Sequence, residues 1–322
     1  MTGKVPPEEL HKFVFSRVGA VDEDVQVGPT YGEDTAAIDL GEEVLVVNSD
    51  PIIYGAERIG TLGVNIASND VGASGADPEW MTVTYLLPDR DGELLDHITR
   101  AVDRISRELG IAIVGGHSEY IAEVERPFLA LTCFGRTDRY VPTGGAHPGE
   151  RVILTKGAGL EATGIIATDF REELEGSVSS ELIEKGEERL TQLSILPEAG
   201  LLKPYATAMH DPTEGGVVNG LFELAAASSV KLEINRSEII VGEETRKLCS
   251  VMGVNPLKVF GSGALLATVP EEKAEEAIEV LVNSGIPASI IGTVKTGDIP
   301  ELVIGDEVFK EPVRDQLYDL WD

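Results

Sequence analysis

The sequence predicts a two-domain α+β protein. Short runs of apolar and β-branched residues alternate along it with longer segments of helical apolar spacing, as in layered folds that combine sheets and helices. The 322 residues suit two domains, and 42% hydrophobic residues are enough to fill their cores. A Gly- and Pro-rich stretch without apolar periodicity, VPTGGAHPGE at 141–150, separates the two halves. We therefore expect an N-terminal domain at residues 1–146 and a C-terminal domain at residues 147–322.

Strands are expected where four to eight apolar, mostly β-branched residues stand between turn-forming residues. A strand pair is expected around Ile38 and Leu45. The expected strands are residues 43–47, 80–87, 112–114, 127–134, 151–155, 231–234, 263–269, 288–294 and 301–304.

Helices are expected where apolar residues recur three and four positions apart. No short tandem period is visible, which argues against solenoid and propeller folds. The expected helices are residues 55–74, 92–109, 160–169, 179–192, 194–205, 216–227, 242–252, 271–282 and 311–320.

The expected helix at 55–74 is unusual because it consists almost wholly of Gly, Ala, Ser and small aliphatic residues. Glycine inside a helix costs about 0.5–1 kcal/mol relative to alanine, so several glycines need a reason. One reason is close approach of another backbone at a subunit or domain interface. The other is a ligand near Asn65, Asn69 and Asp70, since Asn65 and Asn69 share a helix face with Asp70 next to it.

The chain is strongly acidic: 26 Lys and Arg stand against 56 Asp and Glu, giving a formal charge of −30. Such a field repels phosphate backbones and anionic lipid, so we expect no nucleic-acid or membrane partner. The acidity is spread along the whole chain and lysine is scarce, which favours a halophilic source. An ordinary acidic cytosolic protein is the alternative.

The two cysteines, Cys133 and Cys249, stand in apolar surroundings with no CxxC partner. They are expected to be buried thiols, which fits a reducing compartment and argues against a zinc cluster. The first residues, MTGKVPPEEL, lack an apolar signal-peptide core, and no apolar run approaches the length of a membrane span. We expect a cytoplasmic protein.

Three carboxylate-bearing segments could gather around a cation. Asp34 follows Gly32 and Glu33 at a turn, Asp50 follows Asn48 and Ser49 at a strand end, and Asp70 lies in the small-residue helix. Mg²⁺ prefers such oxygen ligands, completed by water and nucleotide phosphates. The alternative is a set of solvated acids at loop ends.

A strand followed by Gly115, Gly116, His117, Ser118 and Glu119 could let a phosphate or sugar approach backbone amides. This match is weak, because the chain contains no P-loop or dinucleotide-binding glycine pattern. His117 alone is more often a hydrogen-bonded histidine than a metal ligand.

The segment His210–Val217, HDPTEGGV, precedes an apolar helix whose N-terminal amides could bind an anion. Helix capping by Asp211 or Thr213 is the alternative, but it does not account for Glu214 and the two glycines. Lys156 offers a cation at another strand-to-helix turn, and residues 260–263 open the backbone before a strand. Either of these two elements could also be ordinary turn chemistry.

Seven motifs, taken in order, resemble those of one superfamily across nearly the whole chain: GEDTAA, NSDP, NIASNDVGASGADP, VGGHSE, TKGAGLEATGIIA, HDPTEGGV and FGSGALLATVP. The superfamily unites aminoimidazole ribonucleotide synthetase, thiamine-monophosphate kinase, selenophosphate synthetase and the hydrogenase-maturation protein HypE. The chain looks most similar to archaeal HypE-like proteins.

This resemblance implies a two-domain α+β fold of the synthetase type. The N-terminal domains of two subunits would pair as a β-barrel in a homodimer, and the C-terminal α/β domain would hold a mixed sheet. ATP and Mg²⁺ would bind between the domains, and the family chemistry phosphorylates an oxygen or selenium nucleophile, often an amide or carbamoyl oxygen.

Roles follow from the matched motif positions as expectations. Catalytic roles are expected for Asp50, His117 and Asp211. Metal ligands are expected at Asp34, Asp50, Asp70, Asp211 and Glu214. Nucleotide contacts are expected from Gly32, Ser49, Asn69, Gly115, Gly116, Glu119, Lys156, Thr213, Gly215 and Gly216.

Three positions depart from the family pattern. His117 stands where many relatives carry an acid, and Glu33 replaces one Asp of a Gly-Asp-Asp turn. HypE proper ends in Pro-Arg-Ile-Cys, whose Cys receives the carbamoyl group, whereas this sequence ends in Leu320, Trp321 and Asp322.

We therefore expect an ATP- and Mg²⁺-dependent enzyme whose acceptor is a separate small amide or a partner protein. The alternatives are a small-metabolite kinase resembling thiamine-monophosphate kinase and a non-catalytic nucleotide-binding assembly factor.

Overall fold

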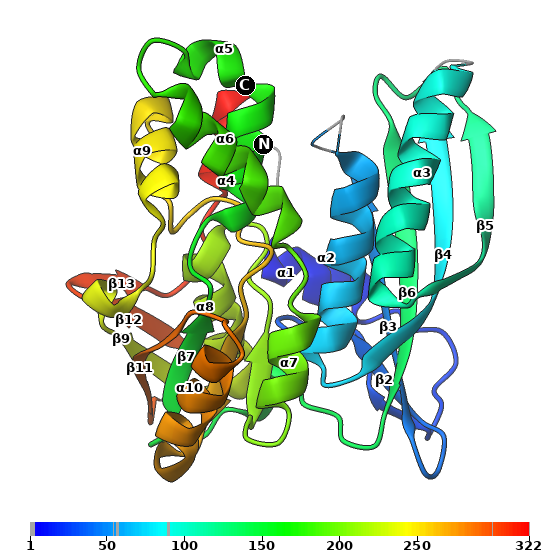
Figure 1. Cartoon of the computed structure of the whole chain (residues 1–322). Coiled ribbons are helices and arrows are strands. Elements are labelled where there is room, and N and C mark those ends of the chain that lie inside the picture. Colours follow the sequence, from blue (N-terminus) through cyan, green and yellow to red (C-terminus); the bar gives the residue numbers. More distant parts are fainter. Residues whose placement is uncertain (1–3, 54, 56–57, 89–90, 298, 322) are drawn as a thin grey trace.

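The computed structural model describes residues 4–53, 55, 58–88, 91–297 and 299–321. Two β-sheets, each with its own helices, stand side by side and divide the chain into an N-terminal and a C-terminal domain (Figure 1). The linker between the sheets spans 138–150, and residue 146 remains our proposed boundary. No described helix has both the length and the apolar character needed to cross a bilayer.

The N-terminal sheet has six strands in the order β1-β2-β3-β6-β4-β5. The neighbours β4 and β5 run parallel and the other described pairs run antiparallel. The strands are β1 (Val25–Val27), β2 (Ala36–Asp39), β3 (Val44–Ile52), β4 (Asp77–Leu87), β5 (Ala112–Tyr120) and β6 (Phe128–Thr137).

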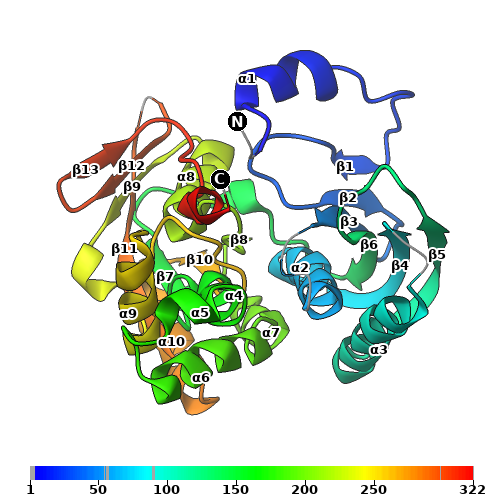
Figure 2. The same cartoon turned by 90° about the horizontal axis from the view of Figure 1, so that it is seen from above.

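Two helices, α2 (Ile59–Ala73) and α3 (Gly92–Leu109), cover the same face of this sheet, and α2 lies between the sheet and the C-terminal domain (Figure 2). Asp91 starts α3 by accepting from the amides of Glu93 and Leu94. Ahead of the sheet lie a short α1 (Pro7–Glu9) and a π-helical turn at Leu10–Val14. In the part of the chain that the structure describes, no helix covers the other face of β3, β6, β4 and β5 (Figure 2).

The small residues of α2 are explained by close packing within the chain. A Cβ on Gly60 would lie 2.7 Å from the carbonyl oxygen of Ile98 in α3, and one on Gly72 would lie 2.5 Å from Leu196 of the C-terminal domain. Of the two reasons expected for these glycines, the approach of another element across a domain interface is therefore present.

The C-terminal sheet has seven strands in the order β13-β12-β9-β11-β7-β10-β8. It is mixed as expected, because β9 and β12 run parallel whereas the other described pairs run antiparallel. The strands are β7 (Arg151–Thr155), β8 (Ala208–His210), β9 (Lys231–Ile234), β10 (Leu266–Val269), β11 (Ala288–Lys295), β12 (Glu301–Ile304) and β13 (Glu307–Phe309).

Helices pack on both faces of this sheet, which explains why β7 is an unbroken apolar run. On one face Val152 and Leu154 pack with α8, and on the other Ile153 packs with α7 and α10. The helices are α4 (Leu160–Asp169), α5 (Arg171–Leu174), α6 (Ser180–Glu188), α7 (Leu196–Leu202), α8 (Gly216–Ser228), α9 (Glu243–Met252) and α10 (Ala274–Asn283).

Several expected elements need correction. The expected helix at 311–320 is wrong over its first half: Pro312 disfavours helical geometry before it, and only Gln316–Leu320 forms a 3₁₀ helix, capped by Asp315. The expected helix at 55–74 is described from Ile59, with residues 54 and 56–57 outside the described part. The strand expected at 112–114 does not end there but continues through the Gly-Gly segment as β5, which ends at Tyr120.

Candidate metal and nucleotide site

Three aspartates meet where the two domains face each other. Asp34 lies two residues before β2, Asp70 lies in α2, and Asp211 follows β8. One carboxylate oxygen from each lies within 4.8 Å of the others. The structure thus brings together three of the expected metal ligands, two from one domain and one from the other.

The electrostatics of this aspartate cluster favour a bound cation. Both carboxylate oxygens of Asp211 are buried without a hydrogen-bond partner. Burial and the charge of Asp34 raise the pKa of Asp211 to about 8. Burial and the charge of Asp211 likewise raise the pKa of Asp70 well above its usual range. Buried carboxylates without partners are costly, so oxygen ligands in this arrangement suit a hard divalent cation.

Asp50 joins the cluster through Asn48. Both residues lie on the α2-facing side of β3, because alternate side chains of a strand share a face. Asn48 Nδ2 donates to Asp50 Oδ2 at 2.9 Å and also to Asp70 Oδ2. Asn48 was not among the residues expected in the site, although its position two residues before Asp50 was a usable signal.

The buried His210 is a second residue of the site that was not among the expected site residues. Its Nδ1 lies 2.8 Å from Asp34 Oδ2, and its Nε2 lies 3.1 Å from Glu223 Oε2 in α8. Burial alone would lower the pKa of His210, but the charges and hydrogen bonds of Asp34 and Glu223 raise it well above its usual value. Each ring nitrogen therefore faces a carboxylate oxygen, which can only accept a hydrogen bond.

Lys4 completes this group from the N-terminal segment. Its Nζ lies 2.9 Å from Glu223 Oε1, and its backbone amide donates to Glu214 Oε1 at 2.9 Å. Burial raises the pKa of Glu223, but Lys4 and His210 outweigh it and lower the pKa to about 2. Glu214, an expected metal ligand, is thus already engaged by Lys4.

Gly32 and Glu33 contact backbone atoms around the site. Glu33 accepts from the amides of Thr143 and Gly144 at 3.0 and 2.7 Å, which fixes the interdomain linker. A Cβ on Gly32 would lie 2.8 Å from the carbonyl oxygen of Glu223, and its φ of +91° favours glycine.

The expected residues of β5 lie elsewhere in this chain. Asp50 pairs with Leu131, Leu131 with Val83, and Val83 with Gly116, so Gly116 stands three strands from Asp50. At the usual strand spacing that is about 14 Å between backbones. His117 and Glu119 are exposed and contact each other, His117 Nε2 lying 3.1 Å from Glu119 Oε2, and Gly115 is exposed as well.

Lys156 and Asn69 both form hydrogen bonds to the backbone of residues 192–195, a segment of the C-terminal domain. Lys156 Nζ lies 2.8 Å from Glu198 Oε1 and donates to the carbonyls of Gln192 and Ser194. Asn69 donates to the carbonyl of Leu193 and accepts from the amide of Ile195. Ser49 was also an expected nucleotide contact. It lies on the opposite face of β3 from Asn48, and its Oγ is 3.0 Å from Thr132 Oγ1.

The turn before α8 is closed by the chain itself. The amide of Gly215 donates to Asp315 Oδ2 at 2.6 Å, so a carboxylate occupies the position expected for a phosphate. The carbonyl of Thr213 accepts from the amide of Gly216 at 3.0 Å. A Cβ on Gly216, whose φ is +62°, would lie 2.5 Å from the carbonyl oxygen of Val259, which explains this glycine.

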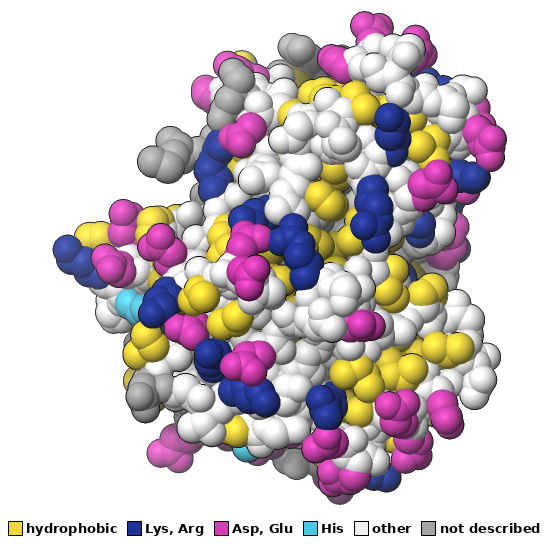
Figure 3. All heavy atoms as spheres, turned by 90° about the vertical axis from the view of Figure 1, so that its left-hand side faces the viewer, with side chains coloured by type: hydrophobic (Ala, Val, Ile, Leu, Met, Phe, Trp, Pro, Cys, Tyr) yellow, Lys and Arg dark blue, Asp and Glu magenta, His cyan; other side chains and the backbone are white. Residues whose placement is uncertain are grey.

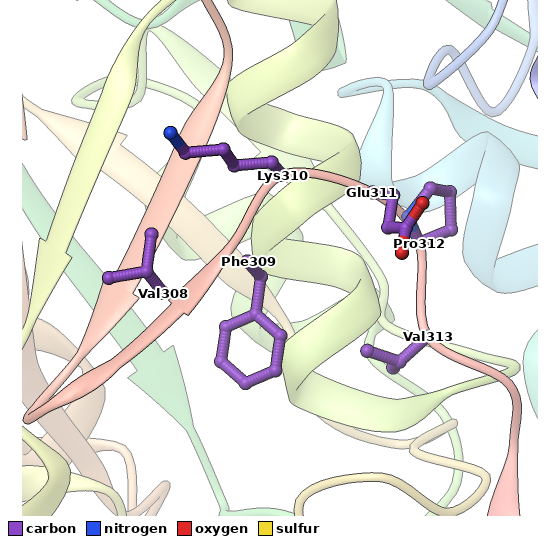
Figure 4. A pocket seen from close by; sticks show the side chains of 6 residues that line it. All are labelled: Val308, Phe309, Lys310, Glu311, Pro312 and Val313. Carbon is purple, nitrogen blue, oxygen red and sulfur yellow. The ribbon is translucent and has the colours of Figure 1, made fainter.

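Two hollows open on the C-terminal domain, apart from the aspartate cluster. One, of about 330 Å³, is lined by residues 308–313, which include the end of β13 and the segment that follows it, and Figure 4 shows Lys310 and Phe309 pointing in different directions. The other, of about 230 Å³, includes Arg236 and Arg246. Figure 3 shows Lys and Arg side chains interspersed with Asp and Glu on the face of the molecule that looks left in Figure 1.

Comparison with known proteins identifies the family. The profile described as "AIR synthase related protein, N-terminal domain" matches residues 32–137, and its C-terminal counterpart matches residues 147–305. The chain belongs to the AIR synthase related family. The two matched regions cover all of both sheets except the edge strands β1 and β13, and they include the three clustered aspartates.

Relatives of this AIR synthase related chain match over most of its length. It is 25% identical to a protein of Methanocaldococcus jannaschii described as a hydrogenase expression/formation protein, over 98% of this chain and 96% of that one. It is 30% identical to the carbamoyl dehydratase HypE of Azotobacter vinelandii, over 81% of this chain and 78% of that one. A solved structure of HypE in complex with ATP matches with a TM-score of 0.73 at 21% identity, covering 96% of this chain and 93% of that one. The two-domain fold expected from the sequence is confirmed.

Proposed function

We propose that this chain is an ATP- and Mg²⁺-dependent phosphoryl-transfer enzyme that acts on an amide or carbamoyl oxygen. The observation that carries the proposal is the cluster of Asp34, Asp70 and Asp211, together with the unpartnered, buried carboxylate of Asp211. Phosphoryl transfer asks the protein mainly for positioning and for compensation of the charge on the triphosphate.

The chain's own residues would divide this task between the domains. Asp34, Asp50 and Asp70 would hold the cation from the N-terminal side and Asp211 from the C-terminal side. Mg²⁺ bound there would neutralise the triphosphate, which allows a chain of net charge −30 to bind an anionic nucleotide. Asn48 would keep Asp50 and Asp70 turned toward each other.

The acceptor is proposed to be separate from this chain's cysteines. The A. vinelandii relative is a carbamoyl dehydratase, which supports an amide or carbamoyl acceptor. Cys133 and Cys249 are fully buried, and burial raises the pKa of each thiol to about 12. Neither thiol is therefore suited to receive a carbamoyl group.

We also propose a homodimer formed through the helix-free face of the N-terminal sheet. Alternate residues of β6 are half-exposed on that face, and β5 is exposed along its whole length. Exposed Ile113, Val114 and Tyr120 are unusual on an edge strand that faces only solvent.

Titration calorimetry with ATP and Mg²⁺ tests the site. Asp50→Asn and Asp211→Asn are expected to weaken Mg-ATP binding by about tenfold or more while the fold is retained, because each removes a proposed metal ligand. Asp306→Asn, at an exposed turn, is the matched control. Unchanged affinity in both variants would refute the assignment.

An acceptor screen then tests the reaction. Mg²⁺-dependent ADP or phosphate release that requires an amide or carbamoyl compound supports the proposal. Release that requires a small phosphorylated metabolite would instead indicate a kinase. ATP binding without turnover in any screen would indicate an assembly factor.

A further inference from the structure

We propose that His210 is a positioning residue for Asp34, and that Glu223 and Lys4 hold His210 in place for this purpose. The proposal rests on the metal site proposed above and names the residues that orient one of its ligands. None of the three residues is itself a proposed ligand.

The first observation concerns which oxygen of Asp34 is used. His210 Nδ1 lies 2.8 Å from Asp34 Oδ2, and Thr143 Oγ1 donates to the same oxygen at 3.2 Å. Among the hydrogen bonds of the described residues, none goes to Asp34 Oδ1. Two partners on one oxygen fix the plane of the carboxylate and leave the other oxygen for a cation.

The second observation concerns the choice of side chain. His210 stands between two carboxylates, Asp34 at one nitrogen and Glu223 at the other, and a carboxylate only accepts. A protonated imidazole donates in both directions along a fixed axis. A side-chain amide would present its oxygen toward one of these carboxylates.

The third observation is that Glu223 is itself held. Its Oε1 lies 2.9 Å from Lys4 Nζ and 3.4 Å from Asn219 Nδ2, one turn earlier in α8. His210 and Glu223 are 3% and 4% exposed, so neither side chain has room to reorient. Lys4, Glu223, His210 and Asp34 thus form a continuous line of polar contacts that runs from the N-terminal segment to the proposed metal site.

Positioning and simple electrostatics predict opposite effects on metal affinity. Lys4 is a cation, so deleting its charge would strengthen binding of a divalent ion if only long-range charge mattered. If Lys4 and His210 orient Asp34, deleting either side chain weakens binding, because the carboxylate oxygen is released from its fixed plane. The sign of the change therefore separates the two roles.

The experiment is a Mn²⁺ titration of the full chain, followed by electron paramagnetic resonance of free Mn²⁺, without nucleotide or acceptor. His210→Gln is expected to weaken Mn²⁺ binding by roughly tenfold to a hundredfold, as for other residues that orient a metal ligand. Lys4→Met is expected to weaken it by about threefold, because Lys4 acts through two further residues. Lys4→Arg is expected to restore most of the affinity.

Lys12→Met is the matched control, since it removes the same charge from the same N-terminal segment at an exposed position. Its Mn²⁺ affinity is expected to stay within twofold of the unaltered chain or to rise slightly. Near-ultraviolet circular dichroism checks each fold. If His210→Gln does not fold, the Lys4 variants decide the question, because Lys4 is partly exposed.

Unchanged or tighter Mn²⁺ binding in folded His210→Gln, or in Lys4→Met if the former does not fold, overturns the positioning role and leaves the proposed function standing. Failure of the unaltered chain to bind Mn²⁺ overturns the metal site and this inference together. Weaker binding in the variants and not in Lys12→Met supports it.

Discussion

Asn69, inside α2, donates through Nδ2 to the carbonyl oxygen of Leu193 at 2.8 Å, although 124 residues separate them in the sequence. Its Oδ1 accepts from the amide of Ile195 at 3.0 Å, so one side chain satisfies the backbone on both sides of Ser194. Lys156 Nζ donates hydrogen bonds to the carbonyl oxygens of Gln192 and Ser194. The helix that carries Asp70 is thereby fixed to the C-terminal domain, which carries Asp211.

Replacing Asn69 with Leu is expected to lower the free energy of unfolding by about 2–4 kcal/mol, because the carbonyl of Leu193 and the amide of Ile195 would be left buried without partners. Asn65→Leu is the matched control one turn earlier, where the side chain donates only to the carbonyl of Thr61 within the same helix. Urea unfolding measures both. Equal losses in the two variants would show that the contact to 193–195 contributes nothing specific.

The sequence carried enough information to gather the aspartates but not to assign their neighbours. Asp34, Asp70 and Asp211 were assigned through their positions in motifs that resemble those of the superfamily, whereas local pattern alone left solvated acids and helix capping open as alternatives. Lys156 and Asn69 bind a segment that no local pattern connects to them. Such partners depend on how the domains pack, which periodicity does not encode.

The contacts of Asp315 and Lys4 were likewise not predictable from periodicity, because their partners lie far away in the sequence. Asp315 reaches Gly215 from 100 residues away, and Lys4 reaches Glu223 from 219 residues away. The fold class was more accessible than the contacts, because alternating helical and strand patterns determine layers without determining side-chain partners.

Gly116 is explained by the neighbouring strand rather than by a ligand. Its φ is +142°, and a Cβ there would lie 1.8 Å from the carbonyl oxygen of Val83 in β4. Gly116→Ala is therefore expected to destabilise the chain by about 2 kcal/mol or more, whereas Gly115→Ala, whose nearest atom would be 3.9 Å away, should stay within about 0.5 kcal/mol. Thermal unfolding compares them. Unchanged stability of Gly116→Ala with weaker nucleotide binding would restore the ligand explanation.

Glu161, in the first turn of α4, makes stability depend on pH. Burial raises its pKa from 4.5 to about 7 in the folded chain. Between these values the folded state keeps a proton that the unfolded state releases, so stability falls as pH rises, by up to about 1.4 kcal/mol per pH unit for this group. Most of the loss is complete just above pH 7.

Glu161→Gln removes this titration. The variant is expected to match the unaltered chain near pH 4.5 and to exceed its stability by roughly 3 kcal/mol at pH 8, measured by urea unfolding at constant ionic strength. Glu184→Gln, at an exposed position of α6, is the control, and its free energy of unfolding should follow that of the unaltered chain at every pH. If the free energy of unfolding of Glu161→Gln and of the unaltered chain depended on pH in the same way, Glu161 would ionise in the folded chain without a loss of stability.

Val114 tests whether the helix-free face of the N-terminal sheet pairs with a second copy. Its side chain is 58% exposed in β5, and Val282 in α10, at 54%, offers a control of equal chemistry on the other domain. Light scattering at high salt, where the repulsion between chains of charge −30 is screened, is expected to give twice the 34.4 kDa mass of the chain.

Val114→Glu is expected to shift this assembly to monomer, since a carboxylate would be buried against the acidic partner, whereas Val282→Glu should remain dimeric. Far-ultraviolet circular dichroism should be unchanged in both, because neither side chain is buried within one chain. A monomer in the unaltered protein would rule out the pairing. A dimer that survives Val114→Glu would place the contact away from this position of the edge strand.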